Sequence, residues 1–166
     1  QLRGAMPLRV EMVLPDERLR AVAERLGARP GADLAIQIGG LAQALGRATV
    51  ALASTGTVTL ECALFGVPTV ALYKTSWATY QVGRRLATVE YMAMPNLLAG
   101  AVVFPEFIQD AATPGALATA AGELLRDPVR RRAARERLFR LREELGGPGA
   151  SARAAAAILA PWNGKE

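Results

Sequence analysis

A short polar loop followed by a carboxylate is the segment of this sequence most suggestive of chemistry. Residues 53–61 read Ala-Ser-Thr-Gly-Thr-Val-Thr-Leu-Glu and lie between an apolar run and a helical pattern. A helix that begins at Gly56 offers unpaired backbone N–H groups and a positive dipole end, which together bind phosphate. Glu61 lies four residues after Thr57 on the same helical face, where a carboxylate suits a ribose diol. The segment therefore predicts a nucleotide-phosphate site.

The same segment also has a purely structural interpretation. Ser54 and Thr55 would then cap the helix, and Glu61 would reach solvent at the edge of that helix. However, the helix is apolar almost all round, as expected of a helix buried within a domain. A carboxylate in such surroundings needs a partner, and a bound ligand is one candidate.

The composition excludes several other classes of site. The chain has 166 residues, no histidine and one cysteine, Cys62. A Ser-His-Asp triad, a Cys-His pair, an imidazole metal site, a zinc cluster and an internal disulfide are therefore excluded within it. We expect no metal and no cofactor. The lone cysteine and the absence of a signal-peptide pattern in residues 1–12 favour a cytoplasmic location.

The elements that must position the polar loop follow from the hydrophobic periodicity. Strands are predicted over 8–14, 33–38, 49–54 and 68–73, with helices over 16–26, 41–45 and 56–65. Further along, the pattern predicts a helix over 76–86, a weak strand over 89–94, an irregular segment over 95–109, and helices over 114–125, 129–145 and 151–159 that cap the sheet. Apolar strands that alternate with helices are typical of a parallel sheet. We therefore expect one α/β domain over 1–166, a Rossmann-like three-layer parallel sheet with helices on both faces and a helical C-terminal end.

Several blocks of the sequence share a pattern and a spacing that extend over residues 7–159. They are Thr55-Gly56-Thr57-Val58-Thr59-Leu60-Glu61, Gly66-Val67-Pro68, Tyr73, Pro95 to Gly100, Pro105-Glu106-Phe107, Gln109, Ala112-Thr113-Pro114 and Gly149-Ala150-Ser151. Together these blocks resemble the lipid-A-disaccharide synthases, which are inverting glycosyltransferases of the two-domain GT-B type. The first block alone is shared with other sugar-nucleotide enzymes, whereas its combination with Pro95 to Gly100 is specific.

This resemblance implies a donor domain, half of a GT-B fold, that binds the UDP of UDP-diacylglucosamine. Gly56 and Thr57 would lie near the diphosphate, Glu61 on the ribose, and Asn96 and Gln109 along the cleft. The full set of implied binding residues is Thr55, Gly56, Thr57, Glu61, Tyr73, Lys74, Asn96 and Gln109. The implied reaction is metal-independent transfer to an acylated glucosamine phosphate, diacylglucosamine-1-phosphate, in one displacement that gives a β-linked disaccharide and UDP.

The resemblance begins inside the second domain of the family. We therefore expect a donor half that is truncated at its N-terminal end and inactive alone, with the catalytic base in the domain that has no counterpart here. Two positions also depart from the family pattern, since Lys74 and Ala101 stand where the family has arginine. A lysine keeps the charge but loses the bidentate fork that binds phosphate. An inactive relative is accordingly an alternative, and another UDP-sugar enzyme such as an epimerase is a second.

Two surface features suggest further partners. Arginines dominate residues 126–142, but glutamates and an apolar stripe interleave with them, so we favour a solvated helix face over a nucleic-acid site. Aromatic and basic residues that suit a bilayer interface gather in one short predicted helix: Trp77, Tyr80, Arg84 and Arg85. Contact with the periphery of the inner membrane is therefore a further expectation. Apolar surface where a second domain would sit would also permit a homodimer.

Overall fold

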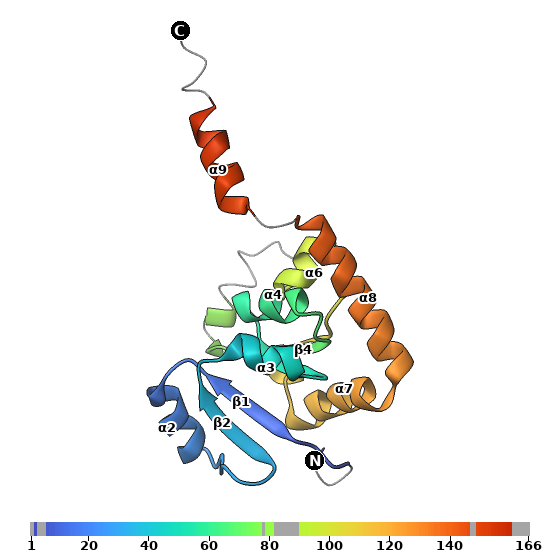
Figure 1. Ribbon diagram of the computed structural model, residues 1–166. Helices are drawn as coiled ribbons and strands as arrows, with labels where there is room; N and C mark the ends of the chain where they lie inside the picture. The colour runs from blue at the N-terminus through green and yellow to red at the C-terminus, as the bar shows by residue number, and fades with distance from the viewer. Residues whose placement is uncertain (1, 3–5, 78, 82–89, 147–148, 161–166) are drawn as a thin grey trace.

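The computed structural model describes residues 2, 6–77, 79–81, 90–146 and 149–160, and it has an α/β architecture (Figure 1). Its first half alternates strands and helices: β1 (Val10–Leu14), α2 (Glu17–Arg25), β2 (Leu34–Ile38), α3 (Leu41–Arg47), β3 (Ala51–Ser54), α4 (Thr57–Leu64) and β4 (Thr69–Tyr73). Its second half is mainly helical: α6 (Met94–Ala99), β5 (Glu106–Ile108), the 3-10 turn η1 (Gln109–Ala111), α7 (Pro114–Arg126), α8 (Pro128–Glu144) and α9 (Ala150–Leu159). The predicted α/β class and helical C-terminal end are confirmed.

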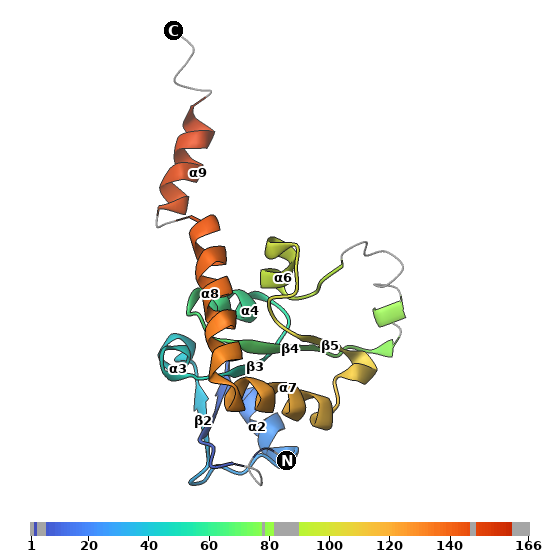
Figure 2. The ribbon, with the colours of Figure 1, turned by 90° about the vertical axis from the view of Figure 1, so that its right-hand side faces the viewer.

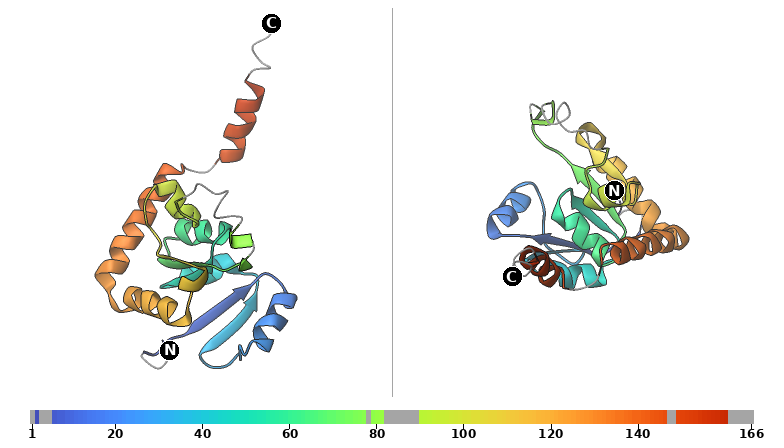
Figure 3. Two further views of the ribbon diagram at one scale, coloured as in Figure 1. Left: turned by 180° about the vertical axis from the view of Figure 1, so that it is seen from behind. Right: turned by 90° about the horizontal axis from the view of Figure 1, so that it is seen from above.

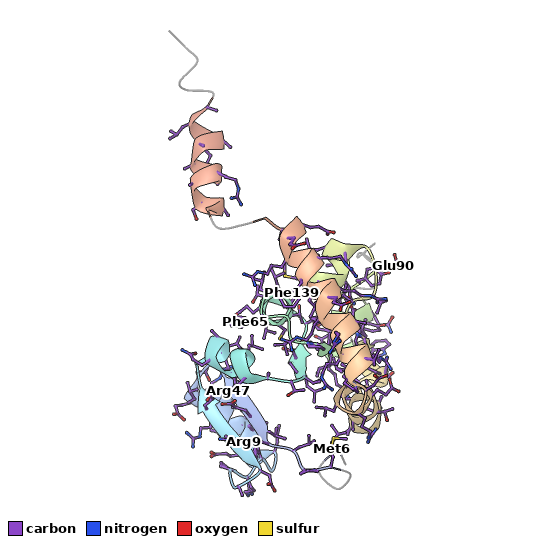
Figure 4. All side chains as sticks on the ribbon, turned by 45° about the vertical axis from the view of Figure 1, so that its right-hand side comes forward. Met6, Arg9, Arg47, Phe65, Glu90 and Phe139 are labelled. Carbon is purple, nitrogen blue, oxygen red and sulfur yellow. The ribbon has the colours of Figure 1, made fainter. Side chains whose placement is uncertain are left out.

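The strands pair in parallel, as the sequence predicts, but they form two sheets in the described part of the chain. Strands β1 and β2 make one sheet, and β3, β4 and β5 make the other in the order β3-β4-β5. The expectation of one continuous sheet is wrong for these residues. Hydrophobic periodicity identifies strands, but the choice of neighbours depends on tertiary contacts that leave no periodic signal. Helix α3 joins the two sheets, and its Arg47, which is labelled in Figure 4, forms an ion pair with Glu11 of β1.

Helices cover both faces of the β3-β4-β5 sheet, as predicted. Val70 and Ala71 are consecutive residues of β4 with 0% exposure, and their side chains point to opposite faces. Val70 packs with α7, whereas Ala71 belongs to the larger core formed with α4 and α8. Figure 2 shows α7 on one side of β4 and α4 on the other.

The larger core explains how α8 is held. Its Leu138 is 1% exposed, and Leu141 is 4% exposed in the same cluster as residues of α4. On the same helix, the ring of Phe139 lies over Gly66, where a Cβ would meet it at 3.3 Å, and Figure 4 shows it near Phe65. Gly66 has φ 66°, a conformation that favours glycine. The chain therefore leaves α4 at the same residue against which the Phe139 ring packs.

Two predictions for the second half are wrong, and a third extends beyond the described residues. No strand occurs over the described residues 90–94, and α6 begins at Met94 with Pro95 in its first turn. The segment 95–109, predicted to be irregular, contains α6 and β5. Both elements are too short to show an apolar stripe, which is the signal from which helices and strands are predicted. Hydrogen bonds to polar side chains hold them in place instead. Of the helix predicted over 76–86, residues 77 and 79–81 are helical, and 78 and 82–86 lie outside the described residues.

Helix α9 does not cap the sheet, contrary to the prediction. All ten of its residues are exposed, and Ile158 is 76% exposed. The left view in Figure 3 shows α9 projecting beyond the end of α8. None of the helices in the described ranges has the length and apolarity required to cross a membrane.

Candidate functional site

The loop between β3 and α4 is held in place by its own backbone. Thr55 N–H donates to the carbonyl of Leu72 at 2.8 Å, which ties the loop to the end of β4. Gly56 has φ 139° and ψ −165°, a conformation that is essentially restricted to glycine. Thr59 then fixes this turn, since its buried hydroxyl donates to the carbonyl of Gly56 at 2.7 Å. The sequence analysis listed Thr59 within the motif but assigned it no role.

The N-terminal turn of α4 is open to a ligand. No side chain caps this helix, and both Gly56 and Thr57 are exposed. The first N–H groups of a helix have no partner within it, and those of Thr57 and Val58 bond to no described residue at the positive end of the helix dipole. The capping part of the structural interpretation is wrong, because neither Ser54 nor Thr55 caps the helix with its side chain.

Glu61 lies one helical turn beyond Thr57 and is half-buried. Its carboxylate forms no hydrogen bond or ion pair with any residue that the structure describes. The helix is less enclosed than the sequence predicts, because Thr57 and Leu64 are exposed while Thr59, Cys62 and Ala63 are buried. Glu61 therefore lies at the boundary of the buried face, where its oxygens are accessible to hydroxyl donors.

The carboxyl ends of β3, β4 and β5 lie at the same edge of their sheet. The register pairs Ser54 with Leu72 and Tyr73 with Ile108. Consequently Thr55, Lys74 and Gln109, which directly follow the three strands, come to this edge together. Ligands of open parallel sheets bind at such an edge. The half-buried Tyr73 ends β4, and Lys74 is exposed and has no ionic partner among the described residues.

Gln109 links two of the three strand ends. Its side-chain amide accepts from Thr75 N–H at 2.7 Å and donates to the Thr75 carbonyl at 3.1 Å. Its own backbone is strained, with φ 51° at a non-glycine residue. The pair of hydrogen bonds fixes the backbone that follows Lys74. Thr75 was missed by the sequence analysis, and its backbone contact leaves no signal in residue type.

Asn96 is placed differently from the other predicted residues. It is 0% exposed, and both faces of its amide are occupied by protein groups. Its Nδ2 donates to the Phe104 carbonyl at 2.8 Å and to Glu106 Oε1 at 2.7 Å, while its Oδ1 accepts from Val103 and Phe104 N–H, both at 2.8 Å. Asn96 thus fixes the loop before β5 from inside the domain, and the structure does not bring it to the strand edge.

Glu106 completes this buried network. It accepts from Met92 N–H and Ala93 N–H, both at 2.9 Å, in addition to Asn96. Its two oxygens therefore anchor the chain entering α6 to strand β5. Through these bonds, Glu106 connects the block from Pro95 to Gly100 with the block around Glu106 itself.

The membrane-facing residues predicted from sequence are only partly described. Trp77 is 75% exposed and Tyr80 is half-buried, whereas Arg84 and Arg85 lie outside the described residues. Elsewhere, burial raises the pKa of the Cys62 thiol, so that a nucleophilic thiolate is disfavoured. Within the described ranges, no group of three His, Cys, Asp or Glu side chains could hold a metal ion.

Comparison with known proteins identifies the family of this chain. The family model described as lipid-A-disaccharide synthetase (LpxB) matches residues 8–160. A lipid-A-disaccharide synthase of Syntrophus aciditrophicus (strain SB) is 43% identical over 116 residues, which are 70% of this chain and 30% of that protein. One of Geobacter metallireducens (strain ATCC 53774 / DSM 7210 / GS-15) is 48% identical over 104 residues, which are 63% of this chain and 27% of that protein.

The matched region is a minor part of these relatives, because the chain spans about 30% of the length of the curated proteins that it matches. The match to the family model is longer and extends from the residues just before β1 to the end of α9. It therefore includes the β3–α4 loop and the strand edge described above. The chain belongs to the lipid-A-disaccharide synthase family.

Proposed function

We propose that this chain is the donor-nucleotide-binding domain of a lipid-A-disaccharide synthase, and that it binds the UDP of UDP-diacylglucosamine. The observation that carries the proposal is the uncapped N-terminus of α4 beside the Gly56 turn, with Glu61 unpaired one turn further along. The site lies at the carboxyl edge of a parallel sheet, where nucleotides bind in related folds.

The diphosphate would bind at the first turn of α4. Backbone N–H groups and the positive end of the helix dipole both favour an anion there, and glycine at position 56 lets the phosphate oxygens approach the backbone closely. The exposed Lys74 follows the adjacent strand and supplies a cation near the same edge. A lysine acts there as a point charge, without the bidentate geometry of arginine.

The ribose would bind Glu61. A carboxylate without a protein partner can accept two hydroxyl hydrogen bonds, and such charge-assisted bonds are about twice as strong as neutral ones. Along the helix, Glu61 lies about 6 Å from Thr57, at 1.5 Å per residue, which suits the separation of a diphosphate and its ribose.

The residues of this chain would stabilise the leaving group. As the bond to the anomeric carbon breaks, charge develops on the UDP diphosphate, and fixed N–H donors with Lys74 lower the energy of that state. Transfer to diacylglucosamine-1-phosphate would require a base from outside these residues. We accordingly expect the chain to bind nucleotide but not to transfer sugar alone, and we expect the enzyme to act in the cytoplasm at the inner membrane.

A catalytically inactive relative is the second candidate function. Lys74 and Ala101 replace two arginines of the family pattern, and Ala101 is exposed in the loop after α6. Such a relative would retain nucleotide binding but not transfer. Activity of the chain combined with the acceptor domain of a relative would distinguish these candidates.

The direct test is calorimetric titration of UDP into the chain and into Glu61→Gln. We expect saturable binding by the wild type and a loss of about 1.5–3 kcal/mol in the variant, the range for hydrogen bonds to charged groups. Glu136→Gln is the matched control, since Glu136 is an exposed glutamate of α8. Equal UDP affinity in Glu61→Gln and the wild type would contradict the ribose assignment.

A further inference from the structure

The backbone ladder between β4 and β5 stops at the edge of the sheet where the candidate nucleotide site lies, to the right in Figure 2. Its last pair in register is Tyr73 with Ile108. Gln109 follows Ile108 but turns into η1 with φ 51°, so its backbone cannot continue the strand. Lys74 and Thr75, the residues after Tyr73, therefore lie beyond the backbone ladder.

The side chain of Gln109 continues the pairing where its backbone stops. Its amide oxygen accepts from Thr75 N–H at 2.7 Å, and its amide nitrogen donates to the Thr75 carbonyl at 3.1 Å. Thr75 thus receives one acceptor and one donor, as it would from a neighbouring strand. We call these two bonds the Gln109–Thr75 pair. The pair and the ladder at Tyr73 hold the backbone on both sides of Lys74.

The conformation of residue 109 favours glycine, yet the chain has glutamine there. Among the residues that the structure describes, Gln109 is the only one other than glycine with a positive φ. The left-handed conformation is strained for a residue that has a Cβ. A glycine would relieve this strain, but it would have no side chain with which to bind Thr75. The strain is therefore linked to the Gln109–Thr75 pair, and strained residues of this kind are concentrated at functional sites.

Lys74 is the residue whose backbone the pair fixes. Its side chain is exposed and makes no hydrogen bond or ion pair with any described residue. The ammonium of a lysine is a point charge on a flexible stem, so the position of the Cα determines how close the charge stays to a bound anion. A backbone that is already ordered also loses less entropy when the ammonium binds. Lys74 is thus a cation that the fold holds ready at the strand edge.

Gln109 itself is poorly placed to bind a ligand directly. It is half-buried, and both polar atoms of its amide contact Thr75. A ligand that took either atom would compete with a bond that orders the strand edge. The resemblance puts Gln109 along the cleft as a binding residue, whereas the geometry favours an effect through Lys74.

We propose that Gln109 is a positioning residue that holds Lys74 in place for the diphosphate, and that it thereby contributes to selection of UDP over uridine. This inference rests on the nucleotide site proposed above. Gln109 does not touch the nucleotide in this account. Its effect on affinity requires both the ammonium of Lys74 and the phosphates of the ligand.

The test is a double-mutant cycle of Gln109→Met and Lys74→Gln, with UDP affinity measured by calorimetry. Methionine has nearly the length of glutamine but cannot form the Gln109–Thr75 pair. We expect Lys74→Gln to weaken UDP binding about tenfold, as for the loss of one hydrogen bond to a charged group. Gln109→Met alone should weaken it about two- to tenfold, the range for ordering one side chain on binding. In the Lys74→Gln background, Gln109→Met should change the affinity less than about twofold, since no ammonium is left to position.

Controls separate positioning from a general loss of charge or of structure. Arg132→Gln removes a charge from an exposed position of α8, and Gln43→Met makes the matched substitution at an exposed position of α3. Each should change UDP affinity less than about twofold. Uridine affinity, followed by NMR, should be the same in the wild type and in Gln109→Met, whereas a distorted site would bind both ligands more weakly.

Three results would overturn the positioning role. They are equal losses from Gln109→Met in both backgrounds, wild-type UDP affinity in Gln109→Met, and a parallel loss of uridine affinity in that variant. In each of them the wild type still binds UDP, so this inference fails while the nucleotide site stands. No UDP binding by the wild type would refute the nucleotide site and this inference with it.

Discussion

Replacing Asn96 with alanine should separate a structural role from a ligand-binding role. The substitution removes four hydrogen bonds and leaves the N–H and carbonyl of Phe104, a residue that is 1% exposed, without partners. Each buried polar group left unsatisfied costs about 1–3 kcal/mol. Because water reaches the half-buried Val103 and Glu106, we assign most of the loss to Phe104 and expect about 4 kcal/mol in total.

That loss is a large part of the 5–15 kcal/mol by which most domains are stable. For a chain of this length it corresponds to a decrease in Tm of roughly 8–16 °C. Thermal and urea unfolding of Asn96→Ala, followed by circular dichroism, would measure it. Gln43→Ala, at an exposed position of α3, should stay within about 0.5 kcal/mol of the wild type.

The same variant should bind UDP with nearly wild-type affinity below its Tm, because Asn96 lies inside the domain. Stability within about 1 kcal/mol of the wild type would refute the hydrogen-bond reasoning. Wild-type stability with a large loss of UDP affinity would instead support the original assignment of Asn96 to the ligand-binding cleft.

Four other predictions follow from single residues. Gly56→Ala should cost about 1–3 kcal/mol of stability and weaken UDP binding in calorimetry, because φ 139° is strained for alanine. Gln109→Ala should weaken UDP binding in calorimetry, because it removes the two bonds to Thr75 that fix the backbone after Lys74; wild-type affinity would contradict this. Leu138→Ala should cost about 2–5 kcal/mol in urea unfolding, because its side chain is 1% exposed. The thiol of Cys62, whose pKa is raised by burial, should react with a thiol reagent at pH 8 only after unfolding; rapid reaction in the native state would contradict its placement.

The first half of the fold could be predicted because its elements differ in period. Strands β1 to β4 are short apolar runs, and the helices between them carry apolar stripes, so that each predicted strand overlaps an observed one. The pairing of these strands could not be predicted from the same signal. It depends on which backbone edges meet, and β1 and β3 do not pair in the described residues.

The second half shows where periodicity stops being informative. Strand β5 has three residues, and a network of polar side chains ties it to the start of α6. Side-chain amides and carboxylates that bond to backbone are compatible with almost any element, so Asn96 and Glu106 gave no local signal of a helix or a strand. Resemblance singled out these residues, but only the structure assigns Asn96 to the interior and Glu106 to its hydrogen-bond network.

The candidate site was predictable in part for a similar reason. Gly56 and Thr57 were singled out because a small polar turn between a strand and a helix commonly binds phosphate, and the structure places that turn at the start of α4. The contact of Gln109 with Thr75 spans 34 positions of the chain and joins a side chain to a backbone. Residue types alone cannot indicate such a contact, because the backbone N–H and carbonyl that Gln109 binds are present in almost every residue.

The most direct test of the account is to locate the diphosphate on the backbone. Amide resonances of the chain would be followed by NMR during titration with UDP and, separately, with uridine. We expect UDP to shift the amides of Thr57 and Val58 at the start of α4, and we expect uridine, which lacks the phosphates, to leave them unchanged. Saturable UDP binding that leaves both amides in place, or equal shifts with uridine, would contradict a phosphate site at this helix.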